Sequence, residues 1–121
     1  ALAEDELLTR IRFPVWSGTV SASVQEVARR AGDFALAGAA LQVQNEDGRV
    51  VRAALALFGV ADTPLRCTEA ERALCEGASA DDVAEIAVRD AEPSDDIHAT
   101  GNQRRQMAAA MVRRSIAEVL T

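Results

Sequence analysis

The stretch "FALAGAALQVQNEDGRVVRAALALFGV", residues 34–60, carries the signal that decides the fold. Two apolar runs, 34–44 and 49–60, flank the short polar loop "NEDG", which ends in glycine. Apolar runs joined by such a loop are typical of a β-hairpin. Several side chains in the runs are very small, among them Gly38, Ala40 and Ala54, so we expect helices to pack close to this sheet.

The segments before the hairpin also suggest strands. Side chains alternate in character along residues 7–13, where Leu7, Thr9, Ile11 and Phe13 share one phase and Leu8, Arg10 and Arg12 the other. This period-2 pattern predicts a half-buried strand that ends at Pro14. Residues 19–30 fit a strand or a helix face, and their content of β-branched residues favours a strand.

The segments after the hairpin carry helix start and stop signals. In residues 68–77, Thr68 and Glu71 have capping-box spacing, and Gly77 is placed to end the helix. Ser79 and Asp82 repeat the capping relation at the start of a second predicted helix.

A third helix is predicted to begin at Thr100. Its apolar stripe keeps a 3.6-residue period almost to the C-terminus, through Ala108, Met111, Val112, Ser115, Ile116 and Val119. Strands followed by helices, without alternation, predict an α+β fold with the helices on one face of a mostly antiparallel sheet. The length of 121 residues fits one domain, residues 1–121.

Composition excludes several classes of function. The net charge is −6, whereas binding to phosphate backbones needs clustered basic residues, so neither nucleic acid nor an anionic membrane is an expected partner. The sequence has no apolar run long enough for a membrane span. Its two cysteines, Cys67 and Cys75, suggest buried or half-buried thiols in a reducing compartment, and we expect a cytoplasmic protein.

A hydrolytic site could be attempted from Ser94, Asp95, Asp96 and His98. A nucleophile, base and orienting group must converge on one point, and a short loop rarely folds such close neighbours onto each other. The sequence therefore favours a helix-entry loop with a surface histidine, and we expect no catalytic residue in this chain.

Metal and phosphate sites are also disfavoured. Asp81 and Asp82 lie in the first turn of a predicted helix, where the dipole favours acidic residues, and a single histidine leaves no transition-metal set. The glycines match no phosphate-binding loop. The arginine pairs at 104–105 and 113–114 fit a solvated helix face better than an anion site. The residues alone thus indicate a soluble α+β domain that is not an enzyme by itself.

A family resemblance carries the interpretation further. Four segments, taken in order, resemble the C-terminal domain of the FAD-binding medium subunit of molybdenum hydroxylases, with the carbon monoxide dehydrogenase flavoprotein nearer and the xanthine dehydrogenase flavin domain more distant. They are "ELLTRIRFPVW" (6–16), "VQEVARRAGDFALAGAAL" (24–41), "GRVVRAALALFGVADTPLR" (48–66) and "PSDDIHATGNQRRQMAAAMVRRSIAEVL" (93–120).

The resemblance implies a three- to four-stranded antiparallel sheet followed by three helices. It also implies that upstream domains, absent from this chain, hold most of the FAD while this domain covers part of the flavin. The partners would be an iron–sulfur subunit and a molybdopterin subunit, whose electrons reach the flavin and then an external acceptor. The alternative is a stand-alone protein-interaction domain that kept the fold without the redox role.

The resemblance assigns two cofactor contacts. Leu8 matches a leucine near the cofactor, and by alternation it points away from Ile11 and Phe13. Gln25 matches a position where some relatives carry a lysine close to the flavin; its amide can donate a hydrogen bond but brings no charge.

Two charged segments match the family pattern as structural features. "RRAGD" is expected to form a charge-paired connection between Arg29, Arg30 and Asp33, with Gly32 supplying an unusual backbone conformation. Asp96, Arg104 and Arg105 are expected to fix the entrance of the last helix. The family usually has a tyrosine just before these arginines, where this chain has Gln103.

Overall fold

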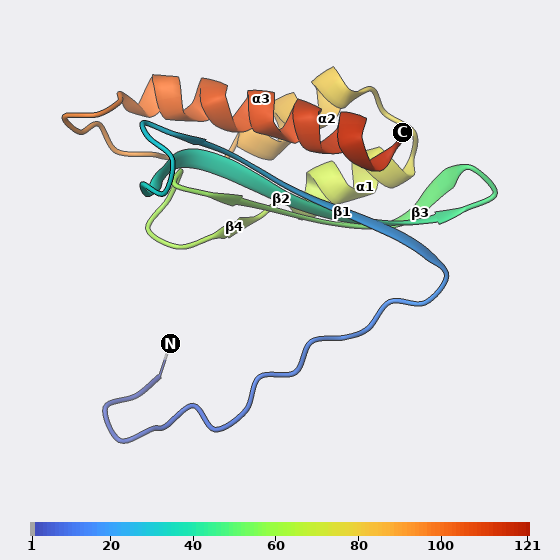
Figure 1. Cartoon of the computed structure of the whole chain (residues 1–121), viewed down its shortest axis with the longest axis horizontal. Helices are drawn as coiled ribbons and strands as arrows, with labels where there is room; N and C mark the ends of the chain where they lie inside the picture. The colour runs from blue at the N-terminus through green and yellow to red at the C-terminus, as the bar shows by residue number, and fades with distance from the viewer. Residues whose placement is uncertain (1) are drawn as a thin grey trace.

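The computed structural model describes residues 2–121, in which four antiparallel strands precede three helices. The strands β1 (Thr19–Ala28), β2 (Ala35–Glu46), β3 (Arg49–Phe58) and β4 (Leu65–Arg66) lie side by side in sequence order. All three helices cover one face of the sheet and leave the other face open (Figure 1). The predicted α+β class, the hairpin and the strand within residues 19–30 are confirmed.

The hairpin turn is tighter than the polar loop suggested. Glu46 pairs with Arg49, so the connection consists of Asp47 and Gly48 alone. Both have positive φ, 49° and 76°, which is the conformation of a type I′ turn and favours an Asp-Gly pair. This turn fixes the register of the two longest apolar runs.

The core lies between the sheet and the helices α1 (Thr68–Cys75), α2 (Ala80–Val88) and α3 (Gly101–Val119). Alternate strand residues form its floor, where Leu41 lies opposite Leu55 and Val43 opposite Ala53. Helix α3 packs on β1 and β2, α1 packs on β3, and α2 contacts both other helices. The predicted stripe of α3 is confirmed, because all its members are buried: Ala108, Met111, Val112, Ser115, Ile116 and Val119.

All three predicted helices are present, and two of the three predicted N-terminal caps are confirmed. The Ser79 hydroxyl accepts a hydrogen bond from the Asp82 backbone N–H, and Thr100 and Gln103 form a full capping box. The capping box predicted for Thr68 and Glu71 is wrong. Thr68 is already helical, and the Glu71 carboxylate instead accepts hydrogen bonds from strand β3 and from β4.

The strand predicted over residues 7–13 is wrong for this structure. These residues form an extended segment without secondary structure that leaves the sheet and runs beneath its open face (Figure 1). Ile11 and Phe13 are 61% and 82% exposed, so the phase expected to face a core faces solvent. A period-2 pattern predicts an extended chain but does not specify the strand with which it pairs. The fourth strand is the two-residue β4 instead.

The two thiols differ in environment. Cys67 is buried and Cys75 is exposed, so the prediction of two buried or half-buried thiols is correct only for Cys67. Burial raises the pKa of the Cys67 thiol to about 11. No helix within residues 2–121 combines the length and the apolar character that crossing a bilayer requires.

Candidate functional site

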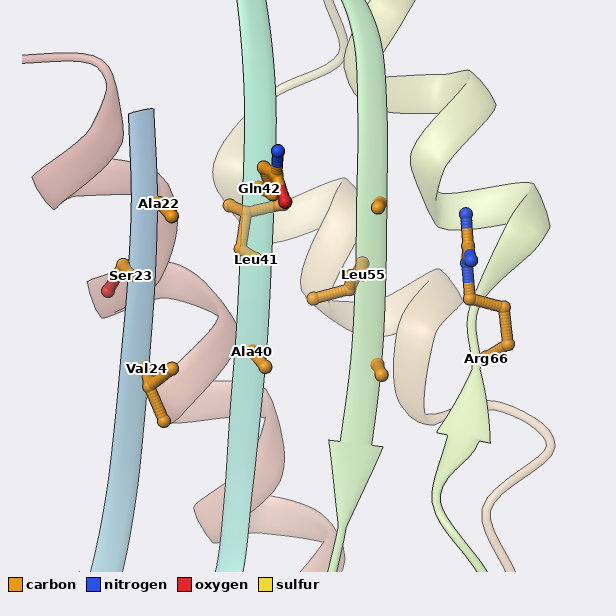
Figure 2. Close-up of a pocket in the computed structure, with 10 residues that line it drawn as sticks. Ala22, Ser23, Val24, Ala40, Leu41, Gln42, Leu55 and Arg66 are labelled. Atoms are coloured by element: carbon orange, nitrogen blue, oxygen red, sulfur yellow. The ribbon is translucent and has the colours of Figure 1, made fainter. Parts of the chain in front are cut away.

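The open face of the sheet carries a shallow trough of about 280 Å³. Figure 2 looks onto this face, with the helices behind the strands and Arg66 at the β4 side. Side chains and backbone from all four strands line the trough: Ala22, Ser23, Val24, Ala40, Leu41, Gln42, Ala54, Leu55, Ala56 and Arg66.

The trough exists because the strands alternate large and very small side chains. Leu41 and Leu55 point toward the helices, whereas their neighbours Ala40, Ala54 and Ala56 face outward and reach little beyond the backbone. Val24, opposite Ala40 on β1, is 68% exposed. A surface of this shape allows a flat group or another protein surface to approach the backbone closely.

A charged network closes the trough at β4. The Glu71 carboxylate accepts a hydrogen bond from the backbone N–H of Leu55 at 2.7 Å and another from Arg66 Nη2 at 3.0 Å. Glu71 therefore accepts from a backbone N–H of β3 that has no partner in the two-residue strand β4. The same carboxylate raises the pKa of the Arg66 guanidinium. Arg66 is thus held in place as a fixed positive charge beside an apolar floor.

The N-terminal segment contacts the sheet at β3, nearer the hairpin turn than the trough. The Arg52 guanidinium lies 4.0 Å from the centroid of the Trp16 ring, a cation–π contact between the segment and β3. Gly18 lies next to this contact and has a φ of 82°, which reverses the chain into β1. Trp16 therefore fixes the point at which the segment departs beneath the open face.

Leu8 lies on this segment and is 57% exposed. The strand that was expected to orient it is absent from the described residues, so its side chain is not placed by pairing with a neighbouring strand. The N-terminal segment that carries it runs beneath the open face, on the uncovered side of the sheet (Figure 1).

Gln25 lies on β1 with its side chain toward α3. Its Nε2 donates a hydrogen bond to Glu118 at 2.7 Å, and the Ser23 hydroxyl donates to the same carboxylate at 2.5 Å. These two donors lower the pKa of Glu118. The structure therefore does not bring Leu8 and Gln25 together on one surface: Leu8 belongs to the N-terminal segment and Gln25 to the contact between β1 and α3.

The segment "RRAGD" forms a charge-paired turn, as predicted, but through Arg29 and Asp33; among the ion pairs of residues 2–121 there is none for Arg30, so that part of the prediction is wrong. Arg29 Nη2 lies 3.1 Å from Asp33 Oδ2, and Gly32 has a φ of 80°. Arg104 lies against this loop from the start of α3 and donates to the Leu36 carbonyl at 2.6 Å as well as to Asp96.

Asp96, Arg104 and Arg105, which were predicted to fix the entrance of the last helix, hold the loop before α3. Asp96 accepts from the backbone N–H groups of Ala99 and His98, which lower its pKa. Arg105 donates to the Ala91 carbonyl at 2.6 Å. The structural roles predicted for Asp96, Arg104 and Arg105 are confirmed.

The acidic residues weighed as catalytic or metal-binding groups have other partners. Asp95 accepts from the backbone N–H of Gly101, Asp82 pairs with Ser79, and Asp81 pairs with Arg113. Within residues 2–121, no cluster of three or more His, Cys, Asp or Glu side chains could hold a metal ion. These carboxylates begin helices or pair with cations, as their positions in the sequence suggested.

The small residues of the hairpin were expected to let helices pack close to the sheet, and this holds for only half of them. Only one phase of each strand meets the helices, and the other phase, with Ala40, Ala54 and Ala56, forms the trough. The signal available in the sequence was the alternation itself, which separates these alanines from Leu41 and Leu55. Without the topology, the sequence does not show which phase is covered.

Comparison with known proteins gives a consistent picture. The sequence model described as "CO dehydrogenase flavoprotein C-terminal domain" matches residues 22–119. Caffeine dehydrogenase subunit beta of Pseudomonas sp. is 38% identical over 96% of this chain and 41% of the relative. The carbon monoxide dehydrogenase medium chain of Afipia carboxidovorans is 34% identical over 96% of this chain and 42% of the relative.

The fold matches solved structures of the same group. Carbon monoxide dehydrogenase from Hydrogenophaga pseudoflava, in a form lacking the Mo-pyranopterin moiety of its cofactor, superposes with a TM-score of 0.82 at 29% identity, over 88% of this chain and 38% of that chain. This chain thus spans about two-fifths of the length of the curated relatives that it matches.

Proposed function

Since this chain belongs to the CO dehydrogenase flavoprotein C-terminal domain family, we propose that its open sheet face covers part of an FAD held mainly by other parts of the same subunit. A member of this family is the C-terminal domain of the FAD-binding subunit of a molybdenum hydroxylase. The family match over residues 22–119, which includes every strand and helix apart from the first residues of β1, is the observation that carries the proposal.

The geometry supports a covering role. One face of the sheet is occupied by helices, and the other presents a shallow apolar trough with Arg66 at its rim. Small side chains let a flat ring system or its protein surround lie close to the strands, and the Arg66 guanidinium, paired with Glu71, supplies hydrogen-bond donors at the rim.

Leu8 is the proposed cofactor contact that the geometry favours, because its segment lies on the uncovered side of the sheet. Gln25 remains a second proposed contact. Its amide already donates to Glu118, so it would meet a flavin only from the edge of β1. We expect Gln25 to act chiefly by holding α3 against β1.

The wider complex follows from the family. We propose that an iron–sulfur subunit and a molybdopterin subunit assemble with the flavin subunit, that electrons pass from molybdenum through iron–sulfur clusters to FAD and then to an external acceptor, and that the complex is cytoplasmic. The rival role, a stand-alone interaction domain, has no observation of its own in its favour, whereas the match to carbon monoxide dehydrogenase chains supports the flavin role.

The test is purification of this chain's natural complex from its host through an affinity tag on its C-terminus. A flavin and iron–sulfur absorption spectrum, together with a large molybdenum-containing partner, is the expected result. A colourless eluate with partners of other classes would reject the flavin role and favour the interaction domain.

The cofactor contact is tested separately in the full-length flavin subunit. Leu8→Asp should lower the FAD retained per subunit, whereas Leu8→Met, which keeps an apolar side chain of similar volume, should retain the full amount. Equal FAD content in the two variants would reject Leu8 as a contact.

A further inference from the structure

We infer that the Phe58 side chain is a further flavin contact on the open face of the sheet, and that Gly38 is the positioning residue that lets its ring lean over the sheet. The inference rests on the proposed function, because that function brings the FAD to this face. It adds a contact from β3, whereas the contacts proposed above belong to the N-terminal segment and to β1.

The ring of Phe58 lies over the neighbouring strand. Phe58 on β3 is paired with Gly38 on β2. A Cβ atom added at Gly38 would collide with Cε2 and Cζ, at the far end of the Phe58 ring. The ring therefore reaches from β3 across to β2, and it occupies the space that a side chain at position 38 would need.

Gly38 is required for this space and not for its backbone conformation. It lies within the regular pairing of β2 and is not among the glycines of residues 2–121 that have positive φ. An added Cβ would also lie 2.9 Å from the backbone carbonyl oxygen of Gln25 on β1. Glycine weakens the interior of a strand, and it often marks a site that another group approaches closely. Here the group that approaches is the Phe58 ring.

Phe58 and Gly38 belong to the phase of the strands that the helices leave uncovered (Figure 1). Ala56 and Ala40, two positions away on the same strands, pair with each other and line the trough. Leu57, between Ala56 and Phe58, has the opposite phase and is buried in the core. The Phe58 ring therefore stands next to the trough, at the end marked by Ala40 and Ala56.

The ring keeps surface for a further contact, because Phe58 is only half-buried. Its buried part is explained by Gly38, since an aromatic side chain can shield a glycine on the neighbouring strand. Its exposed part extends the apolar surface of the trough. Aromatic rings associate with other ring systems by offset stacking or by edge-to-face contact. The isoalloxazine is the aromatic part of FAD, so it is the part that Phe58 would contact.

Release of FAD from the purified natural complex tests the contact, with the fluorescence of the released flavin as the measure. Phe58→Ala should speed the release about tenfold and shift the visible absorption of the FAD that stays bound toward that of free FAD. Leu120→Ala is the control, because Leu120 is an exposed apolar residue at the end of α3, and it should change neither quantity.

Two results for Phe58→Ala would overturn the contact. One is a release rate and a spectrum equal to those of the natural complex. The other is faster release with an unshifted spectrum, which would show that the ring acts only through the stability of the domain. Ala22→Glu, in the floor of the trough, separates this failure from that of the proposed function. If Ala22→Glu also keeps its FAD, the proposed function fails; if Ala22→Glu loses FAD, only the Phe58 contact fails.

The role of Gly38 is tested without FAD in the 121-residue chain. Gly38→Ala should lower the thermal midpoint by roughly 5 °C or more, because the new methyl group meets both the Phe58 ring and the Gln25 carbonyl. In the Phe58→Ala background only the carbonyl remains, so the same substitution should lower the midpoint about half as much. In the complex, Gly38→Ala should shift the flavin spectrum in the same direction as Phe58→Ala. Equal losses in the two backgrounds, or an unshifted spectrum, would overturn the role of Gly38.

Discussion

The two faces of one sheet differ in burial and in shape, although the same strands build both. On the covered face, Leu41, Val43 and Leu55 are at most 2% exposed and pack against three helices. On the open face, Val24 is 68% exposed and the neighbouring alanines leave a trough. The difference shows that one phase of each strand packs the core while the other stays uncovered, so substitutions on the two faces should have separable effects.

The strongest contrast should come from placing a carboxylate on each side of this sheet. Met111, on α3 above the covered face, is 2% exposed, so Met111→Asp should lower the free energy of unfolding by roughly 4 kcal/mol or more and unfold the domain. Val24→Asp, on the open face, should leave the isolated domain folded. Urea unfolding followed by circular dichroism measures both. A native, soluble Met111→Asp variant would show that the packing of α3 is assigned incorrectly.

A smaller loss of unfolding free energy is expected at Glu71, which links β3 and β4 at the edge of the sheet. Glu71→Ala removes the acceptor of the Leu55 N–H, on a strand residue that is 1% exposed, and should cost about 1–3 kcal/mol of unfolding free energy. Glu69→Ala is the matched control, because Glu69 pairs with Arg89 in an exposed ion pair and should cost within about 0.5 kcal/mol. Equal midpoints in urea for the two variants would remove the structural role given to Glu71.

Sequence reasoning succeeded where local chemistry decides the structure. The hairpin around "NEDG", the Ser79 and Thr100 caps and the stripe of α3 each depend on residues close together in the chain. It failed at Glu71, whose capping role was displaced by a strand donor distant in sequence. A capping motif specifies which hydrogen bonds a side chain can make, but it does not reveal the competing partners that the tertiary fold supplies.

Cys67 and Cys75 lie at the two ends of α1, and their thiol reactivity tests the contrast between covered and exposed positions. Burial raises the pKa of Cys67 to about 11, so at pH 8 only about one thiol in a thousand is thiolate. Cys75 is exposed and should react with iodoacetamide at least about tenfold faster. Mass spectrometry of the native chain, with Cys75→Ala as control, gives both rates. Faster labelling of Cys67 in the folded protein would show that its side of the sheet is open.

The smallest predicted effect concerns the pH dependence of the loop before α3. Backbone N–H groups of Ala99 and His98 lower the pKa of Asp96, so its stabilisation is fully present above the unfolded pKa near 4 and is lost as the pH falls through the lower folded value. The stability advantage of the natural chain over Asp96→Asn should therefore shrink below about pH 4. Asp5→Asn, on the N-terminal segment, serves as control. An advantage that grows at low pH would contradict the assignment.

The candidate site was less predictable than the fold. The resemblance identified Leu8 and Gln25, but alternation along β1 turns Gln25 toward Glu118, and the segment that carries Leu8 pairs with no strand among the described residues. The trough depends on which phase of the hairpin the helices cover. That choice is made by contacts between α3, β1 and β2, which lie far apart in the sequence.

The most direct test of the central claim compares one substitution on the two sides of the molecule within the full-length flavin subunit. Ala22 lines the trough and Ala117 lies on α3, and both are exposed, so Ala22→Glu and Ala117→Glu make the same chemical change in different surroundings. The measurement is the flavin absorbance per purified subunit. If the open face covers the flavin, Ala22→Glu should lose FAD and Ala117→Glu should keep it; full FAD retention by Ala22→Glu would contradict the account.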